Sequence, residues 1–164
     1  MLQNPRVLSL IALLASTMTS AVNAHSEFKE ALTEKYGFRS VSCYACHLHK
    51  DQTADFSEDQ LAAYKENSKA FYNAFGKRFL PHTQGKNIAE RVEAKDAAKK
   101  AARAADTEAE EEKLKAEAEK IEGEIIQDVL LMLEKIQAEK DEATGKTYDA
   151  LLKAGDVEGV RLPE

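Results

Sequence analysis

Apolar residues along most of this chain recur every three or four positions, the period of an α-helix, and alternating apolar and polar runs are nearly absent. The pattern predicts a helix over Ser26–Tyr36 that ends at Gly37. It predicts a second helix over Ser57–Leu80, begun by a capping box and stopped by Pro81. One side of this second helix would carry a largely aromatic stripe: Leu61, Tyr64, Ser68, Phe71, Tyr72, Phe75 and Phe79.

Between residues 88 and 120 the composition changes, and alanine, glutamate and lysine fill nearly every position. Asp106 and Thr107, followed by Glu110, form a helix-start signal, which allows two antiparallel helices here. A single long solvated helix is the alternative. We interpret 88–120 as a charged helical insertion or arm and not as a site, and it could serve self-association or pairing with a partner helix.

The last third of the chain predicts two more helices. A wide apolar stripe over Ile121–Ala138 predicts a helix buried on two sides, and Tyr148–Lys153 predicts a short terminal helix ended by Gly155. The fold class expected is therefore all-α, with four to six helices. It would be a small helical domain over residues 25–164 with one long Ala/Glu/Lys-rich segment.

The first 24 residues have the features of a secretory signal peptide. Arg6 is a positive start, Val7–Leu14 is a short apolar run, and Val22–Ala24 supplies small residues where a signal peptidase cuts. We expect cleavage after Ala24, with Ala21 as the alternative position, and a soluble periplasmic product without stable membrane insertion.

The net charge of the chain limits the classes of partner that it can bind, and its aromatic content limits the size of its core. The net charge is −6, and it becomes −7 once Arg6 is removed, which argues against nucleic acid and anionic membranes and favours a partner with a basic docking face. The chain has six Phe, five Tyr and no Trp, so its aromatic core is small. A large apolar cofactor would add to that core.

One short motif carries chemistry. Cys43-Tyr44-Ala45-Cys46-His47 is C-x-x-C-H, the attachment signature of c-type haem. Two thiols at this spacing reach the two vinyl groups of one porphyrin, and the adjacent histidine is aimed at the iron from the same side. The motif predicts one covalent haem c held by Cys43 and Cys46, with His47 as the proximal iron ligand. An aromatic stripe suits packing against a flat macrocycle as well as an ordinary core.

The two cysteines have three other possible uses: a disulfide, a redox pair and a zinc site. A disulfide would close so short a loop that it would stabilise the fold little. A thioredoxin-like redox pair needs a βαβ setting, which this chain lacks. A zinc site could be assembled from four residues, Cys43, Cys46, His49 and His82. Export together with the motif favours haem over all three.

Three segments together resemble the short monohaem cytochromes c of Gram-negative bacteria: Phe28–Tyr36, the C-x-x-C-H motif, and Asn73-Ala74-Phe75-Gly76. The resemblance covers roughly residues 25–85, with Ile121–Gly155 as a further part. It implies a helical fold around one haem and electron transfer between redox partner proteins. The chain departs from the family in lacking a Gly/Pro-rich loop that carries a methionine ligand.

The sixth iron ligand is a separate question. His82 ranks first and Met132 second, with an open sixth position next, while His49 lies too near His47 and His25 would be mobile. A Met/His pair raises the iron potential and a bis-His pair lowers it. We therefore expect a one-electron carrier and not an enzyme. A haem-containing sensor module or a subunit of a larger redox complex is the alternative, and peroxidase-like activity has no support beyond the distal ligand.

Overall fold

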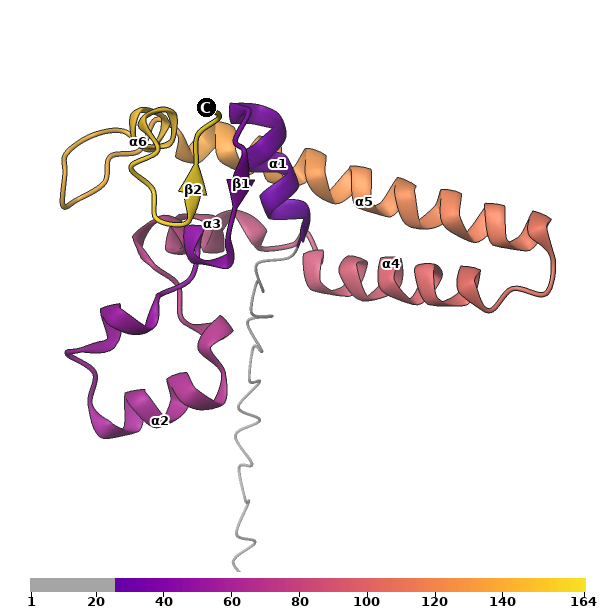
Figure 1. Ribbon diagram of the computed structural model, residues 1–164, viewed down its shortest axis with the longest axis horizontal. Coiled ribbons are helices and arrows are strands. Elements are labelled where there is room, and N and C mark those ends of the chain that lie inside the picture. The colour runs from indigo at the N-terminus through magenta and orange to yellow at the C-terminus, as the bar shows by residue number, and fades with distance from the viewer. Residues whose placement is uncertain (1–25) are drawn as a thin grey trace, which may run out of the picture.

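The structure, a computed structural model, describes residues 26–164. The expected signal peptide, its cleavage position and His25 lie outside the described residues. Figure 1 shows three parts: a body, an arm formed by two long helices that run side by side, and a lobe that stands apart from the body. We call residues 48–71 the lobe, and the helices α4 and α5 beyond the body the arm.

The first helix, α1, spans Ser26–Tyr36, as the sequence predicts. Glu27 lies in its first turn and Lys35 in its last, where each charge suits the helix dipole. Gly37 adopts a left-handed conformation, with φ of +68°, and its N–H donates to the carbonyl of Thr33 at 2.8 Å. Both the helix and its glycine end are confirmed.

The single helix predicted over Ser57–Leu80 is wrong. The chain instead forms α2 over Glu58–Glu66, the 3-10 turn η3 over Ser68–Ala70, and α3 over Ala74–Thr83. Phe71 and Tyr72 between them are extended, and Tyr72 makes an isolated antiparallel bridge with His47. A partner strand outside the segment therefore overrides the helical period.

The predicted start of this helix is confirmed, whereas its predicted stop is wrong. The capping box at Ser57 and Gln60 is confirmed, because each side chain accepts the backbone N–H of the other residue. Pro81 does not stop α3, which continues to Thr83. A proline in the last turn costs one backbone hydrogen bond, and the helix ends two residues later.

The arm is a helical hairpin. Its first helix, α4, spans Ile88–Arg103, and α5 spans Glu108–Ile136. The side chain of Thr107 accepts from the N–H of Glu110, so the helix start expected there is confirmed and the single long helix is wrong. At 1.5 Å per residue, α5 is roughly 43 Å long. This one helix runs from the charged segment into the apolar segment, for which the sequence predicts a separate helix over Ile121–Ala138.

The body end of α5 provides much of the core. Five residues on one face are almost fully enclosed: Ile125, Val129, Met132, Leu133 and Ile136. Ile126, on a second side of the helix, is also buried, but Leu131 is exposed. The predicted burial on two sides is therefore confirmed for only part of the apolar segment. The ring of Phe79 contacts those of Phe28 and Phe75 edge to face, and all three pack into the same core.

The chain ends close to the motif. Helix α6 spans Tyr148–Ala154 and ends at Gly155, as predicted. Strands β1, Ser40–Val41, and β2, Val160–Arg161, pair antiparallel just before the motif (Figure 1). Two-residue strands are too short to show alternation in the sequence, and the all-α class holds. No helix among residues 26–164 combines the length and apolarity needed to cross a membrane.

Ion pairs join the arm to the body. Lys95 of α4 pairs with Glu27 of α1, and both are buried. Asp128 of α5 pairs with Lys86 and, at 2.6 Å, with Arg91. The base of the arm is thus held by charges from three helices.

Candidate haem-attachment site

The C-x-x-C-H motif folds into one compact turn. Residues Cys43–Ala45 form the 3-10 turn η1, which Ser42 caps by accepting the N–H of Tyr44 at 3.3 Å. The N–H groups of Cys46 and His47 both donate to the carbonyl of Cys43, at 3.3 and 3.0 Å. The three residues expected to hold the haem therefore lie on the same turn.

The two thiols have different surroundings. Cys43 is exposed, whereas Cys46 is 6% exposed and belongs to the core cluster. The two sulfurs do not form a disulfide. Burial raises the pKa of the Cys46 thiol to about 12, and the nearby Cys43 acts in the same direction. Cys46 is thus an enclosed neutral thiol in this state of the chain.

His47 is also enclosed, with 4% of its surface exposed. Its ring lies against the ring of Tyr72, with centroids 4.7 Å apart and planes inclined by 31°. Burial lowers the pKa of His47, the charge of Lys69 adds to this, and backbone hydrogen bonding with Phe71 opposes it. The imidazole is therefore neutral near pH 7, and neutral imidazole is the form that binds a metal.

Asn73 holds the motif from the start of α3. Its backbone N–H donates to the carbonyl of Cys46 at 3.0 Å. Its side-chain nitrogen lies within hydrogen-bond distance of three motif carbonyls, those of Tyr44 at 2.8 Å, Ala45 at 3.1 Å and His47 at 3.4 Å. An amide has two N–H hydrogens, so the three contacts share them. The side-chain oxygen accepts from Gly76 and caps α3.

Two glycines let backbone approach the turn from opposite sides. A Cβ on Gly76 would lie 2.7 Å from the carbonyl carbon of Cys46, and one on Gly159 would lie 2.7 Å from the nitrogen of Ala45. Gly159 also has a φ of +74°, and its carbonyl accepts from Ser42 at 2.7 Å. The turn is therefore enclosed by three segments of the chain, near positions 42, 75 and 159.

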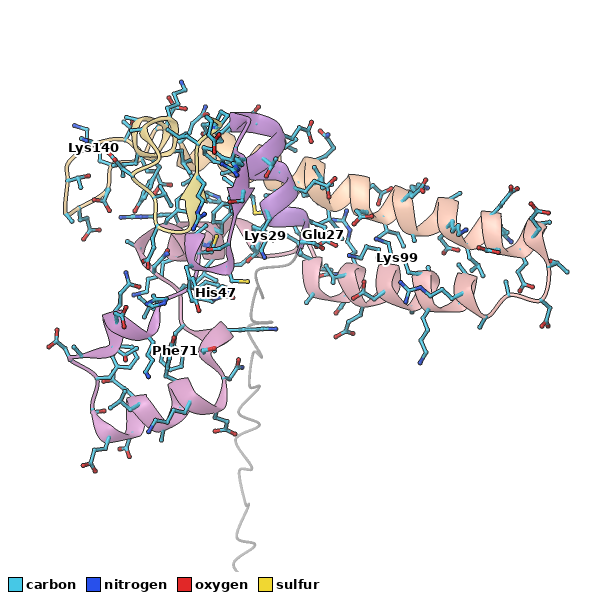
Figure 2. The ribbon with its side chains drawn as sticks, viewed as in Figure 1. Glu27, Lys29, His47, Phe71, Lys99 and Lys140 are labelled. Atoms are coloured by element: carbon cyan, nitrogen blue, oxygen red, sulfur yellow. The ribbon has the colours of Figure 1, made fainter. Side chains whose placement is uncertain are left out.

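The aromatic stripe divides between two places. Phe75 and Phe79 enter the core, whereas Phe56, Tyr64 and Phe71 contact one another in the lobe, with ring centroids 5.4–6.2 Å apart. Within residues 48–71, Thr53 alone is buried. Figure 2 shows His47 and Phe71 where the lobe joins the body. The stripe therefore does not form one face on which a macrocycle would lie.

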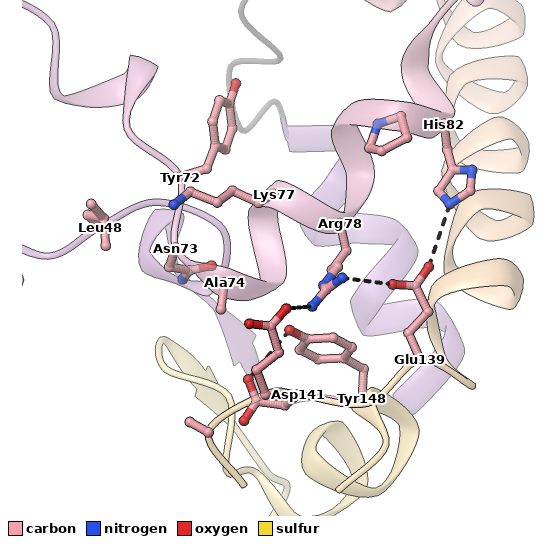
Figure 3. A pocket seen from close by; sticks show the side chains of 13 residues that line it. Leu48, Tyr72, Asn73, Ala74, Lys77, Arg78, His82, Glu139, Asp141 and Tyr148 are labelled. Atoms are coloured by element: carbon pink, nitrogen blue, oxygen red, sulfur yellow. Dashed lines mark hydrogen bonds and ion pairs between the residues drawn. The ribbon is translucent and has the colours of Figure 1, made fainter. Parts of the chain in front are cut away.

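A cavity of about 740 Å³ lies beside the motif, between α3 and the loop that follows α5 (Figure 3). Tyr72 and Asn73 line one part of it and His82 another, but the two cysteines and His47 do not line it. Arg78 lies inside, between Glu139 at 3.5 Å and Glu142 at 3.0 Å. These carboxylates already pair with the charge of Arg78.

The other candidate ligands lie in three different settings. His82 lies in the last turn of α3, nine residues beyond Asn73 or roughly 13 Å along the helix axis, and its Nε2 is 3.8 Å from a carboxylate oxygen of Glu139. Met132 is enclosed in the core. His49 caps the 3-10 turn η2, Lys50–Thr53, by accepting the N–H of Asp51 at 3.3 Å.

The residues of the zinc alternative are not brought together in the fold. Within residues 26–164 no three His, Cys, Asp or Glu side chains are grouped so that they could hold a metal ion. The four residues Cys43, Cys46, His49 and His82 are therefore not assembled as a zinc site. Cys43, Cys46 and His47 do share one turn, and two thiols with an adjacent histidine are the residue types by which a c-type haem is attached.

Sequence reasoning missed two contributors to this site. The Asn73–Gly76 segment entered only as part of a family resemblance, although an Asn three residues before a Gly at a helix start is itself a capping signal. Gly159 had no such signal, because its role depends on chain 117 residues away from Ser42. Comparison of the chain with protein-family models, curated proteins and solved structures finds no match, so the function is argued from the site itself.

Proposed function

We propose that the chain is an exported monohaem c-type cytochrome that transfers one electron at a time. The observation that supports this most is the single turn that carries Cys43, Cys46 and an enclosed, neutral His47. Cys43 and Cys46 would hold the haem by thioether bonds and His47 would bind its iron. When bound, the haem supplies an iron that changes its charge by one electron.

The surroundings of the turn support a carrier. Cys43 and the exposed ring of Tyr44 lie at the surface, where a partner protein can approach. The side chains of Cys46 and His47 lie inside, where protein atoms exclude water. The acidic chain favours redox partners with a basic docking face. Export to the periplasm is part of the proposal, because haem attachment of this kind follows secretion.

Haem attachment is tested by expressing the full chain in a bacterial host that matures c-type cytochromes. We expect a periplasmic product whose haem stays with the polypeptide after denaturation and acidic solvent extraction, as read by absorbance and intact mass. Cys43→Ser/Cys46→Ser is expected to lose all covalent haem, because no thiol remains. Tyr44→Ala, between the same cysteines, serves as the matched control and should keep it. A wild-type product without covalent haem would contradict the proposal.

A second function is favoured by a specific observation. His82 lies roughly 13 Å along α3 from Asn73 and Met132 is enclosed in the core, whereas an axial nitrogen must come within about 2 Å of the metal. If neither residue moves, the sixth position stays open or exchangeable, as in a sensor module or a subunit that binds a small gas. His82 is the better placed to move, because an ion pair of 3.8 Å holds its ring, whereas moving Met132 would empty part of the core.

We therefore expect the reduced wild-type product to be six-coordinate and slow to bind carbon monoxide. His82→Ala should convert it to a five-coordinate haem that binds carbon monoxide rapidly. Met132→Leu, a change of similar volume, should leave the spectrum unchanged. Stopped-flow absorbance measures all three. Rapid binding by the wild type would favour the open-site function instead, and a spectrum altered by Met132→Leu alone would identify Met132 as the ligand.

A further inference from the structure

We infer that the outer face of α4 is a docking surface for a second copy of this chain, with the two α4 helices antiparallel. The surface is built on four exposed charged residues that lie along one flank of the helix: Glu93, Asp96, Lys100 and Arg103. We call these four residues the charged flank. The inference goes beyond the proposed function, because it involves neither the motif turn nor a cofactor.

The charged flank is separate from the charges that hold the arm to the body. The basic residues on the inner side of α4 already have acidic partners on α1 or α5: Arg91, Lys95 and Lys99. On the flank, Glu93, Lys100 and Arg103 make no ion pair with any of residues 26–164. Asp96 contacts only the neighbouring Lys95, at 3.4 Å. The flank therefore presents its charges to another molecule.

The order of charges makes the flank complementary to itself. Both acids precede both bases, so the flank is negative toward the start of α4 and positive toward its end. When two copies of one helix pack antiparallel, the same flank of each meets, and the start of one lies beside the end of the other. Glu93 of one copy then lies beside Arg103 of the other. Asp96 likewise lies beside Lys100, and the twofold axis repeats both pairs.

The rest of this face permits a close approach of the two helices. The residues next to the charged flank are alanines with exposed side chains: Ala94, Ala97, Ala101 and Ala104. No bulky side chain separates two such faces, so the helix axes can reach the usual packing distance of about 8–10 Å. In Figure 1, α4 forms one edge of the arm, and no other labelled element lies beyond it.

A second copy fits this face better than an unrelated acidic or basic partner. A uniformly basic protein would match the start of the flank and oppose its end, and a uniformly acidic one would do the reverse. The contact is short, because α4 spans Ile88–Arg103 and is roughly 24 Å long. It buries less than the 1,200 Å² or so of a standard interface, so we expect a reversible dimer with a Kd on the order of 100 μM.

Sedimentation velocity of the full chain, from about 10 to about 500 μM, measures this association. Glu93→Lys/Asp96→Lys makes the whole flank basic and should raise the Kd at least about tenfold, because four attractions become repulsions. The control Glu117→Lys/Glu134→Lys changes the net charge by the same amount at two exposed positions of α5, and should not weaken the dimer. A wild type that stays monomeric throughout, or equal weakening in both variants, would overturn the inference.

A mixing experiment separates complementarity from a general loss of structure. Lys100→Glu/Arg103→Glu makes the flank acidic and should also abolish self-association. Mixed in equal amounts, the basic-flank and acidic-flank variants should form a mixed dimer at least as tight as the wild type, since every pair across the axis is again of opposite sign. Circular dichroism checks that each variant keeps its helices. Two variants that remain monomeric when mixed would show that the charged flank does not form the interface.

Discussion

Replacing Gly76 with alanine is expected to lower the free energy of unfolding by about 3 kcal/mol or more. The new Cβ would overlap the carbonyl group of Cys46 and lie 2.7 Å from its carbon. Backbone on both sides of the contact resists movement, since Asn73 joins the two segments by hydrogen bonds. Either α3 must shift or the motif turn must open. Urea denaturation of the full chain, followed by circular dichroism, measures the loss.

A second glycine provides the matched control. Gly123 lies in α5 with open space around its would-be Cβ, so the same substitution there should raise stability by about 0.5–1 kcal/mol, the helical advantage of alanine over glycine. The two variants differ by the same single methyl group. A gain in stability at Gly76 like the one expected at Gly123, or no change, would show that α3 and the turn do not meet as described.

Replacing Lys95 with methionine is expected to cost about 3–5 kcal/mol, because it leaves a buried carboxylate without its partner. Glu27 is 0% exposed and Lys95 is 4% exposed. Lys99→Met is the control: Lys99 pairs with Glu122 at 2.9 Å but its side chain is 40% exposed, so about 0–1 kcal/mol is expected. The unfolding free energies of both variants are compared at pH 7. A similar small loss in both would contradict the importance of the buried pair.

The pH dependence gives an independent check. Burial alone would raise the pKa of Glu27, but the hydrogen bond and charge of Lys95 outweigh it, so the folded pKa lies below the ordinary 4.5. This contribution to wild-type stability is therefore complete above about pH 4.5 and is lost as the pH falls through the lower folded value. Lys95→Met removes the hydrogen bond and the charge of Lys95, so burial, the largest cause, is expected to raise that pKa.

Acidification below about pH 4.5 should therefore narrow the gap in stability between Lys95→Met and the wild type, because Glu27 is then protonated in both states of the variant. The double variant Glu27→Leu/Lys95→Met should recover much of the loss at pH 7, since it buries no charge. A gap that stays constant with pH would assign the loss to packing of the Lys95 stem.

The sequence predicts a helix end correctly where the residues that cap it are neighbours in the chain. The helix Ser26–Tyr36, the start after Thr107 and the end at Gly155 all depend on groups within four positions in the chain. The motif is local too, and its five residues fold into one turn. Each of these features follows from hydrogen bonds whose partners the sequence places side by side.

Contacts between residues far apart in the chain explain why other sequence-based predictions were wrong. The aromatic stripe had a helical period, yet Phe71 and Tyr72 became extended because His47 and Leu48 supplied backbone partners about 24 residues earlier in the chain. In the sequence, Lys95 is one of many charged residues of the arm, where solvated side chains are expected. Only the packing of α4 against α1 brings it to Glu27. No periodicity within either segment indicates such a pairing.

For the motif, the sequence by itself determined which groups come together: two thiols and an imidazole within five consecutive residues. The tertiary structure alone decided their surroundings, in which Cys43 lies outside and Cys46 and His47 lie inside. The reason is that the turn is held by Asn73 and Gly76 on one side and Gly159 on the other. These contacts join the backbone of the turn to segments far apart from it in the chain, and a local pattern of side chains does not record which segments will meet.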